Sequence, residues 1–258
     1  MLSNAAKSKL KAGETVFGCF VRQPDAGLVE LLGYYGWDFL VFDGEHTTIE
    51  PRDVENLTRA AELRGVTPIA RVPVNQPATI LRFLDTGVQG LHVPNINSAA
   101  EAEAVIQAVK YHPRGQRGLA GVRAANYGQA GALGEYVQKA NAETLVVLHI
   151  ESAEAVENLP GILAVPDVDV AFLGPTDMSQ SLGLPGKLEH PRVQDMLKHA
   201  AELIARSPVA LGMMVRTPAA AHEWQERQAR YIAISFESLL GPAARGYLQA
   251  VRAGADTR

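Results

Sequence analysis

The 258-residue chain contains one cysteine, Cys19, and only seven lysines among its 24 basic residues. A single cysteine excludes an internal disulfide and a thiolate metal cluster, and it favours a reducing compartment. No apolar run approaches the roughly 18 residues that a membrane-spanning helix needs. The opening MLSNAAKSKLKAGE lacks the apolar stretch of a secretory signal. These absences predict a cytoplasmic protein without a membrane partner.

Neither sign of charge dominates the sequence. It has 28 acidic and 24 basic residues, for a net charge of −4, whereas a nucleic-acid-binding domain carries a basic patch. We therefore expect no nucleic-acid partner. The chain also lacks a G-x-S-x-G elbow, a Walker A loop and a G-x-G-x-x-G fingerprint. The usual motifs of serine hydrolases and nucleotide-binding proteins are thus absent.

Short apolar runs alternate with longer amphipathic stretches along the whole chain. Eight strand-like runs are each followed by a segment with helical spacing. The runs are 15–21, 38–46, 67–74, 90–96, 144–152, 168–177, 209–216 and 231–237. Such alternation predicts parallel βαβ units, and eight units in about 250 residues suit a closed barrel. We predict an α/β fold: a (β/α)8 TIM barrel forming a single domain over residues 1–258.

Some helix boundaries can also be predicted. Ser98 is a plausible N-cap for the helix that follows the fourth run. The later helices are expected near 152–164, 190–207, 218–228 and 239–252. The Gly- and Arg-rich segment 112–134 interrupts the alternation. It is long for a connection inside a compact domain, so it is predicted to be a lid or a binding loop.

In a TIM barrel the active site lies at the carboxyl ends of the strands. Glu151 ends the fifth run and Asp177 ends the sixth, and neighbouring strands bring such residues together. Two adjacent carboxylates raise each other's pKa unless a cation lies between them. Mg²⁺ or Mn²⁺ suits carboxylate and water ligands. The alternative is that both are solvated loop carboxylates.

Three further residues precede Asp177 in the sixth run: Gly174, Pro175 and Thr176. Free backbone N–H groups there could receive a substrate carboxylate, and Gly174 permits a close approach of the backbone. The Gly-Pro dipeptide is equally consistent with an ordinary turn.

Arg71 lies in an otherwise apolar run, where a buried guanidinium needs an anionic partner. It either forms a structural ion pair or points at a substrate oxyanion. His46, after the second run, is the best candidate base, since histidine suits acid–base work near neutral pH. His149 shares a strand face with Glu151 because side chains alternate with period two. It lies near the metal or only packs in the barrel. His92 is predicted to be a core histidine.

None of the seven lysines falls within a strand-like run. A Schiff-base mechanism therefore lacks its nucleophile. Cys19 has apolar neighbours and is predicted to be a small core residue. The seventh and eighth runs end without a Gly-rich phosphate cradle, which argues against a phosphorylated substrate.

Five motifs together are similar to the HpcH/HpaI aldolase family. They are FDGEH at 42–46, ARVPVN at 70–75, LDTG at 84–87, HPRGQRG at 112–118 and FLGPTDMSQSLG at 172–183. The resemblance runs from Gly18 to about Leu240. It implies a phosphoenolpyruvate/pyruvate-type barrel and a class II, metal-dependent pyruvate aldolase. It also implies a homo-oligomer, a hexamer built as a trimer of dimers, with the last helix exchanged between subunits.

The resemblance assigns roles to five of these residues. Glu151 and Asp177 would hold the divalent ion, Mg²⁺ or Mn²⁺ with Co²⁺ or Zn²⁺ as alternatives. Arg71 would bind pyruvate, and His46 would be the catalytic base. Asp85 of a neighbouring subunit would orient His46.

The chain departs from the family pattern at two positions beside the expected ligands. His149 stands where many relatives have Gln, and Thr176 stands where many have Ala or another small residue. A different water network or metal preference is therefore open at this site.

The predicted reaction is reversible cleavage of a 4-hydroxy-2-oxo acid to an aldehyde and pyruvate or hydroxypyruvate. The metal would stabilise the developing enolate. Two alternatives remain. One is a CoA-ester lyase of the citrate-lyase type, with Arg114, Arg117 and Arg123 at its rim. The other is a non-catalytic oligomer that binds a 2-oxo acid.

Overall fold

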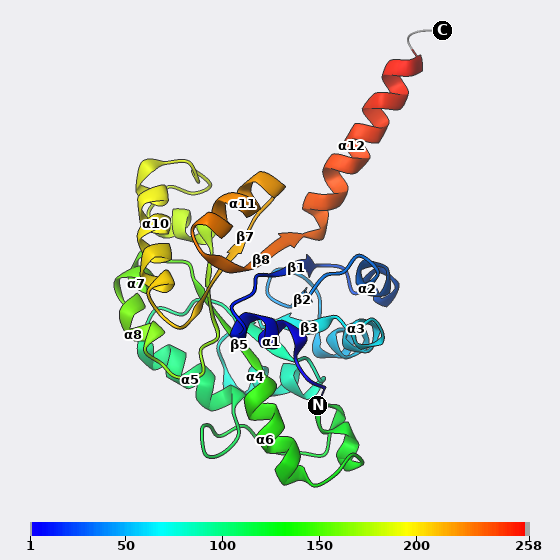
Figure 1. Cartoon of the computed structure of the whole chain (residues 1–258), viewed down its shortest axis with the longest axis vertical. Coiled ribbons are helices and arrows are strands. Elements are labelled where there is room, and N and C mark those ends of the chain that lie inside the picture. The colour runs from blue at the N-terminus through cyan, green and yellow to red at the C-terminus, as the bar shows by residue number, and fades with distance from the viewer. Residues whose placement is uncertain (1, 256–258) are drawn as a thin grey trace.

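The computed structural model describes residues 2–255. Eight parallel strands form a closed barrel in which β8 pairs with β1 (Figure 1). The strands are β1 Val16–Val21, β2 Phe39–Asp43, β3 Thr67–Arg71, β4 Gly90–Val93, β5 Leu145–Ile150, β6 Val170–Leu173, β7 Ala210–Met214 and β8 Ala229–Ser235. All eight lie within the predicted runs or extend them by two residues at most. The predicted TIM barrel is confirmed.

Helices surround the barrel, except α12, which extends away from it (Figure 1). They are α1 Ala5–Lys11, α2 Ala26–Gly33, α3 Pro51–Leu63, α4 Pro77–Asp85, α5 Ala99–Val109, α6 Leu133–Glu143, α7 Ala153–Glu157, α8 Leu159–Leu163, α9 Pro175–Ser181, α10 Pro191–Ala205, α11 Pro218–Glu226 and α12 Phe236–Ala255, with the 3₁₀ turn η1 Arg123–Gly128. Proline stands in the first turn of several of them, where its missing N–H costs nothing. Ser98 caps α5, as predicted, by accepting from the N–H of Glu101 at 3.2 Å.

Two predicted helices differ from those observed. The segment 152–164 is two short helices, α7 and α8, that meet at Asn158. Pro160 stands in the first turn of α8. Proline cannot donate the backbone hydrogen bond that would continue α7, so α7 ends before it. The last helix begins at Phe236 and ends at Ala255, so it is longer than the predicted 239–252. Helices α1, α6 and α9 add to those predicted.

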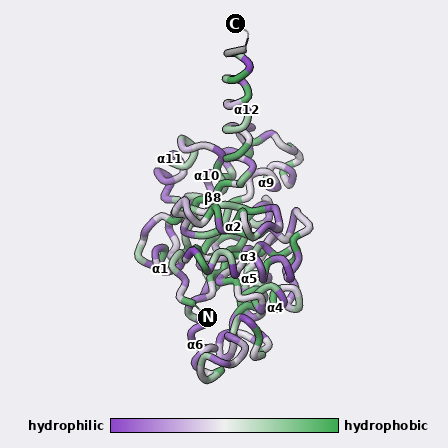
Figure 2. The backbone as a smooth tube through the Cα atoms, turned by 90° about the vertical axis from the view of Figure 1, so that its right-hand side faces the viewer, coloured by the Kyte–Doolittle hydropathy of each residue, from purple (hydrophilic) through white to green (hydrophobic). Residues whose placement is uncertain are grey.

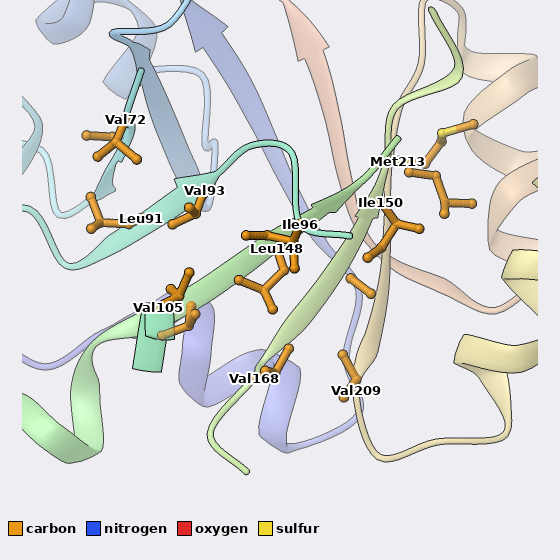
Figure 3. Packing of buried hydrophobic residues seen from close by; sticks show 14 of the residues in the cluster. Val72, Leu91, Val93, Ile96, Val105, Leu148, Ile150, Val168, Val209 and Met213 are labelled. Carbon is orange, nitrogen blue, oxygen red and sulfur yellow. The ribbon is translucent and has the colours of Figure 1, made fainter. Parts of the chain in front are cut away.

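Strand periodicity divides the apolar side chains into two layers. Inward-facing residues such as Phe20, Phe39 and Val147 fill the barrel. Outward-facing residues such as Leu148 and Ile150 pack under the helices (Figure 3). Figure 2 shows the resulting hydrophobic centre of the molecule. The same alternation continues to the carboxyl ends of the strands, where the inward positions become polar.

Gly18 is required by the packing inside the barrel. A Cβ at this position would lie 2.1 Å from the ring of Phe39. That ring stacks on Tyr231, with centroids 4.1 Å apart. Gly18 therefore makes room for two large aromatic side chains in the barrel interior.

The segment 112–134 does not cover the carboxyl end of the barrel. Helix α5 runs back toward the amino ends of the strands, and the segment begins there. Arg123 Nη1 donates to the carbonyl of Thr86 beyond the end of α4, at 2.8 Å. Figure 1 shows α4 and α6 at the end of the molecule away from α12. A lid over the chain's own active site therefore does not fit, because the topology places this connection at the opposite end, whereas the predicted alternative of a binding loop stays a prediction.

Helix α12 projects away from the barrel (Figure 1). Leu240, Tyr247, Leu248 and Val251 lie on it at helical spacing and are 46–71% exposed. Such an apolar stripe on a projecting helix needs another surface to cover it. No helix among residues 2–255 has the length and apolarity to span a membrane.

Candidate active site

A cavity of about 400 Å³ opens at the carboxyl ends of the strands. Its walls come from the ends of six strands and from α9. They are formed by Arg22, His46, Arg71, His149, Glu151, Phe172, Leu173, Gly174, Pro175, Thr176, Asp177 and Met214. The structure thus brings together all of the predicted site residues except Asp85. Their assigned roles remain predictions.

Arg71 is held by two carboxylates. Its Nε and Nη2 donate to the two oxygens of Asp43 at 2.8 and 2.6 Å, and its Nη1 lies 3.0 Å from Oε2 of Glu45. The pairing register places Asp43 directly opposite Arg71 on β2 and β3. Arg71 forms a structural ion pair and also lines the cavity, while its expected contact with a substrate oxyanion stays a prediction. The two hydrogen bonds to Asp43 use only two of the five N–H donors of the Arg71 guanidinium.

Asp43 organises this side of the site. It is fully buried, and it also accepts from Nε of Arg22 at 3.2 Å and from the N–H groups of Glu45 and His46. Burial alone would raise the pKa of the Asp43 carboxyl, but the hydrogen bonds and charge of Arg71 outweigh it and lower that pKa. Asp43 is therefore an anion that fixes two arginines and the loop leading to His46.

Glu45 is a residue that the sequence argument passed over. Burial raises its pKa against the opposing charge of Arg71, and its Oε2 lies 3.7 Å from Nε2 of His46. The only sequence signal was its place between Gly44 and His46. Its partial burial next to Arg71 depends on the fold of this loop, which the sequence pattern does not specify.

Both oxygens of Glu151 have fixed donors. Oε1 accepts from the N–H of Asn95 at 2.7 Å, and Oε2 lies 3.3 Å from Nδ1 of His149. Asn95 has a left-handed backbone, with φ of 57°. Gly174 packs against the same side chain, because a Cβ there would lie 2.8 Å from both Cβ and Oε2 of Glu151. Burial would raise the pKa of Glu151, but the hydrogen bond from His149 lowers it.

His149 also faces the barrel interior. Its Nε2 lies 2.9 Å from Nδ1 of His92, and Nε2 of His92 lies 2.7 Å from the hydroxyl of Tyr231. His92 is fully buried, and this burial lowers its pKa well below the ordinary value. The prediction that His92 is a satisfied core histidine agrees with these contacts. His149 both lines the cavity and packs in the barrel.

Asp177 lies in the first turn of α9, just beyond β6. It is exposed to the cavity. Among residues 2–255, its carboxylate has no ion pair and accepts no hydrogen bond. The neighbouring Gly174 and Pro175 begin the helix, so the turn expected from this dipeptide is a helix start.

His46 and Asp85 lie at opposite ends of the barrel. The His46 side chain is 56% exposed at the carboxyl end. Helix α4 runs back along the barrel and ends at Asp85, where Arg117 Nη2 donates to Asp85 at 2.9 Å. Within one chain the two residues cannot pair, so contact between them needs a second subunit.

The described lysines lie away from the cavity. No described lysine lines it. Lys7 and Lys110 are buried at the amino end, where both donate to the carbonyl of Thr144. Burial and the charge of Lys7 lower the pKa of Lys110 to about 8. The expected absence of a Schiff-base lysine at the site is consistent with this placement.

The arginines proposed for a CoA rim are paired within the chain. Arg114 binds Glu103 and Asp167, Arg117 binds Asp85, and Arg123 binds Glu62. All three lie on the segment 112–134, at the amino end of the barrel. They therefore offer no unpaired cationic rim for CoA phosphates beside the cavity of their own chain.

Comparison with known proteins agrees with the motifs. Residues 16–242 match the family HpcH/HpaI aldolase/citrate lyase. The hydroxypyruvate/pyruvate aldolase of Roseobacter denitrificans is 34% identical over 236 residues, which cover 91% of each chain. The 4-hydroxy-2-oxo-heptane-1,7-dioate aldolase of Shigella sonnei is 35% identical over 244 residues, 93% of this chain and 91% of that one.

A solved structure gives the same result for the fold. The HpcH/HpaI aldolase/citrate lyase family protein from Burkholderia cenocepacia superposes with a TM-score of 0.92 at 33% identity. The match covers 97% of this chain and all of that one. The chain therefore belongs to the HpcH/HpaI aldolase/citrate lyase family, and the prediction of a carbon–carbon lyase of the aldolase type is confirmed.

Proposed function

We propose that this chain is a class II pyruvate aldolase that reversibly cleaves a 4-hydroxy-2-oxo acid to an aldehyde and pyruvate or hydroxypyruvate. One observation carries the proposal. His46, Arg71, Glu151 and Asp177 come from four separate strand ends and line the same cavity. The set combines an acid–base group, a cation and two carboxylates, which are the parts that enolate chemistry requires.

The donor set of the cavity fits a hard divalent cation. Glu151 and Asp177 supply two carboxylates, and the cavity has room for water. No group of three or more His, Cys, Asp or Glu side chains within residues 2–255 has the arrangement of a metal site. Glu151 and Asp177 would therefore hold Mg²⁺ or Mn²⁺ with water and substrate oxygens completing the coordination, as Mg²⁺ commonly binds. Bound there, the cation would act as a Lewis acid on the 2-oxo group.

Arg71 would add positive charge where the enolate oxygen develops. Asp43 holds its guanidinium plane through Nε and Nη2, and Oε2 of Glu45 lies 3.0 Å from Nη1, which leaves one N–H on Nη2 and one on Nη1 for substrate. Preorganised donors of this kind stabilise the transition state because they need no reorientation during the reaction. The backbone N–H of Thr176, in the first turn of α9, would receive the substrate carboxylate. The N–H of Gly174, also expected to be free, instead donates to the carbonyl of Ile150 at 3.1 Å.

His46 would move the proton of the 4-hydroxyl. Its exposed imidazole stands at the mouth of the cavity, on the loop fixed by Asp43. Asp85 of the partner subunit would orient it, since the chain's own Asp85 lies at the other end of the barrel. In the cleavage direction His46 takes the hydroxyl proton as the C3–C4 bond breaks.

The same reasoning favours a homo-oligomer with an exchanged last helix. The apolar stripe Leu240, Tyr247, Leu248 and Val251 projects from the barrel on α12. A second copy of the chain would cover it, within a hexamer arranged as a trimer of dimers. Such an assembly also supplies the second subunit that a contact between His46 and Asp85 needs.

Proton exchange tests this function without knowledge of the aldehyde. The protein is incubated with pyruvate in D₂O and Mg²⁺, Mn²⁺ or Co²⁺, quenched with EDTA, and the methyl signal is read by NMR. We expect metal-dependent loss of the signal and no loss when EDTA is present from the start. Glu151→Gln should abolish exchange, whereas Glu157→Gln, at an exposed position on α7, should not. Absence of exchange with every metal, at verified pyruvate binding, would contradict the proposal.

A further inference from the structure

Four side chains form a continuous line of contacts across the barrel. Oε2 of Glu151 lies 3.3 Å from Nδ1 of His149, Nε2 of His149 lies 2.9 Å from Nδ1 of His92, and Nε2 of His92 lies 2.7 Å from the Tyr231 hydroxyl. His92 is on β4 and Tyr231 is on β8, which lie on opposite sides of the eight-stranded barrel. The line therefore joins the far wall of the barrel to a proposed metal ligand.

This line is enclosed by apolar rings. His92 and Tyr231 are fully buried, and His149 is 2% exposed. The ring of Phe20 meets His92 edge-on at 5.4 Å, and the ring of Phe172 stacks on His149 at 5.1 Å. Within residues 2–255, the ring nitrogens and the hydroxyl have no hydrogen-bond partner outside the line. Each polar atom must therefore be satisfied by its neighbour in the line, because a buried unpaired donor or acceptor is costly.

The available protons allow one direction that satisfies every group. A carboxylate only accepts, so Nδ1 of His149 must donate to Glu151. The other nitrogen of a neutral imidazole then accepts, which requires Nδ1 of His92 to donate to His149. Nε2 of His92 accepts in turn, so the Tyr231 hydroxyl donates to it. The reverse direction leaves the hydroxyl proton of Tyr231 without an acceptor and turns a lone pair of His149 toward the carboxylate.

We propose that Tyr231, His92 and His149 form a one-way hydrogen-bond chain that positions Oε2 of Glu151 for a divalent cation. The N–H of Asn95 fixes Oε1 in the same way, at 2.7 Å. One donor on each oxygen leaves a lone pair on each for the cation. Tyr231 is thus a positioning residue that acts through two imidazole rings. The part concerning the cation rests on the proposed function, whereas the direction of the chain does not.

The direction can be measured on the metal-free protein. Uniform ¹⁵N labelling and long-range ¹H–¹⁵N correlation distinguish protonated from bare imidazole nitrogens. The single variants His92→Phe and His149→Asn assign the two rings among the seven histidines. We expect both rings to carry their proton on Nδ1 and to have a bare Nε2. A proton on Nε2 of either ring, including a doubly protonated His149, would overturn the proposed direction.

The effect of Tyr231 on the distant Glu151 is tested by removing the Tyr231 hydroxyl. Tyr231→Phe should weaken Mn²⁺ binding, followed by electron paramagnetic resonance without substrate, by about three- to tenfold, the size of one net hydrogen bond. Tyr111→Phe is the matched control, because Tyr111 is also buried and, among residues 2–255, its hydroxyl has one hydrogen-bond partner, the Tyr136 hydroxyl at 3.3 Å. That control should bind Mn²⁺ as the unmodified protein does.

A double-mutant cycle distinguishes an effect transmitted through the hydrogen-bond chain from a general loss of packing. In His149→Asn, the side-chain amide can reach Glu151 from the place of Nδ1 but is too short to reach His92. This variant therefore interrupts the hydrogen-bond chain. In that background Tyr231→Phe should have no further effect on Mn²⁺ affinity. An equal loss of Mn²⁺ affinity on Tyr231→Phe in both backgrounds would contradict the proposed hydrogen-bond chain. If Tyr231→Phe does not fold, the ring protons of the unmodified protein still decide the direction.

The two proposals fail differently. Lack of Mn²⁺ binding by the unmodified protein would count against the proposed function, while the Nδ1 protonation pattern would persist. Normal Mn²⁺ binding with a different protonation pattern, or a Mn²⁺ affinity that Tyr231→Phe does not change, would count against the hydrogen-bond chain. Either result would leave the proposed function intact.

Discussion

Arg71 and Asp43 form a two-bond fork inside the barrel mouth, with Nε and Nη2 of the guanidinium 2.8 and 2.6 Å from the two carboxylate oxygens. Asp43 is fully buried and Arg71 nearly so. The parallel register of β2 and β3 places the two residues opposite each other. The fork fixes the plane of the guanidinium, so its remaining N–H groups have a defined direction toward the cavity.

Arg71→Lys should therefore be damaging although it keeps the charge. An ammonium cannot make the planar fork or present a second fixed donor. We expect kcat/KM to fall by about 10²–10³, as for the loss of an oxyanion donor. Mn²⁺ affinity, measured without substrate, should change little because Arg71 is not a proposed ligand. Equal losses in affinity and turnover would contradict its assignment to the substrate.

Asp43→Asn should destabilise the fold as well as the site. Breaking a buried ion pair from one side costs about 3–5 kcal/mol, because the partner charge is left unpaired. Urea unfolding at pH 7 measures this loss. Asp38→Asn, which removes a carboxylate that pairs with the half-exposed Lys9 outside the cavity, is a milder control.

The contribution of Asp43 should also depend on pH. Its folded pKa lies below the ordinary value, so its stabilising effect is complete above the unfolded pKa of about 3.9. The effect is lost as the pH falls through the lower, folded pKa. The difference in unfolding free energy between the parent and Asp43→Asn should stay constant from pH 7 to about pH 5 and shrink below pH 4. A difference that shrinks near neutral pH would exclude this cause.

Gly174→Ala should disturb Glu151 directly. The new Cβ would lie 2.8 Å from Cβ and Oε2 of Glu151, closer than real Cβ contacts. The φ of Gly174 is −108°, which alanine adopts readily, so the clash and not backbone strain is the cause. We expect Mn²⁺ affinity to drop by at least about tenfold, in the range for displaced ligand support. Gly134→Ala, at a helical position where the Cβ meets nothing within 4 Å, is the control.

Charge on α12 should separate assembly from folding. Leu240→Asp together with Tyr247→Asp alters two positions that are exposed in the single chain, so the barrel should still fold. Light scattering should show a smaller assembly. Turnover should fall with it, because His46 would lose a partner subunit's Asp85. Retained turnover in a monomer would show that the active site is complete within one chain.

The sequence by itself determined the barrel and most of the cavity. Eight apolar runs separated by helical segments allow few other folds, and strand ends in this fold gather on one face. Glu151, Asp177, Arg71 and His46 could be chosen on that ground alone, because position along a strand fixes both the end and the face on which a side chain lies.

Only the tertiary structure decided which of these groups touch. The line from Glu151 to Tyr231 joins residues on β4, β5 and β8, and the fork of Arg71 depends on the register of two strands. For the segment 112–134, the sequence shows an unusual length but not at which end of the barrel the segment lies. Periodicity is local and is written in the sequence, whereas contacts across a closed barrel arise only when all eight strands are placed.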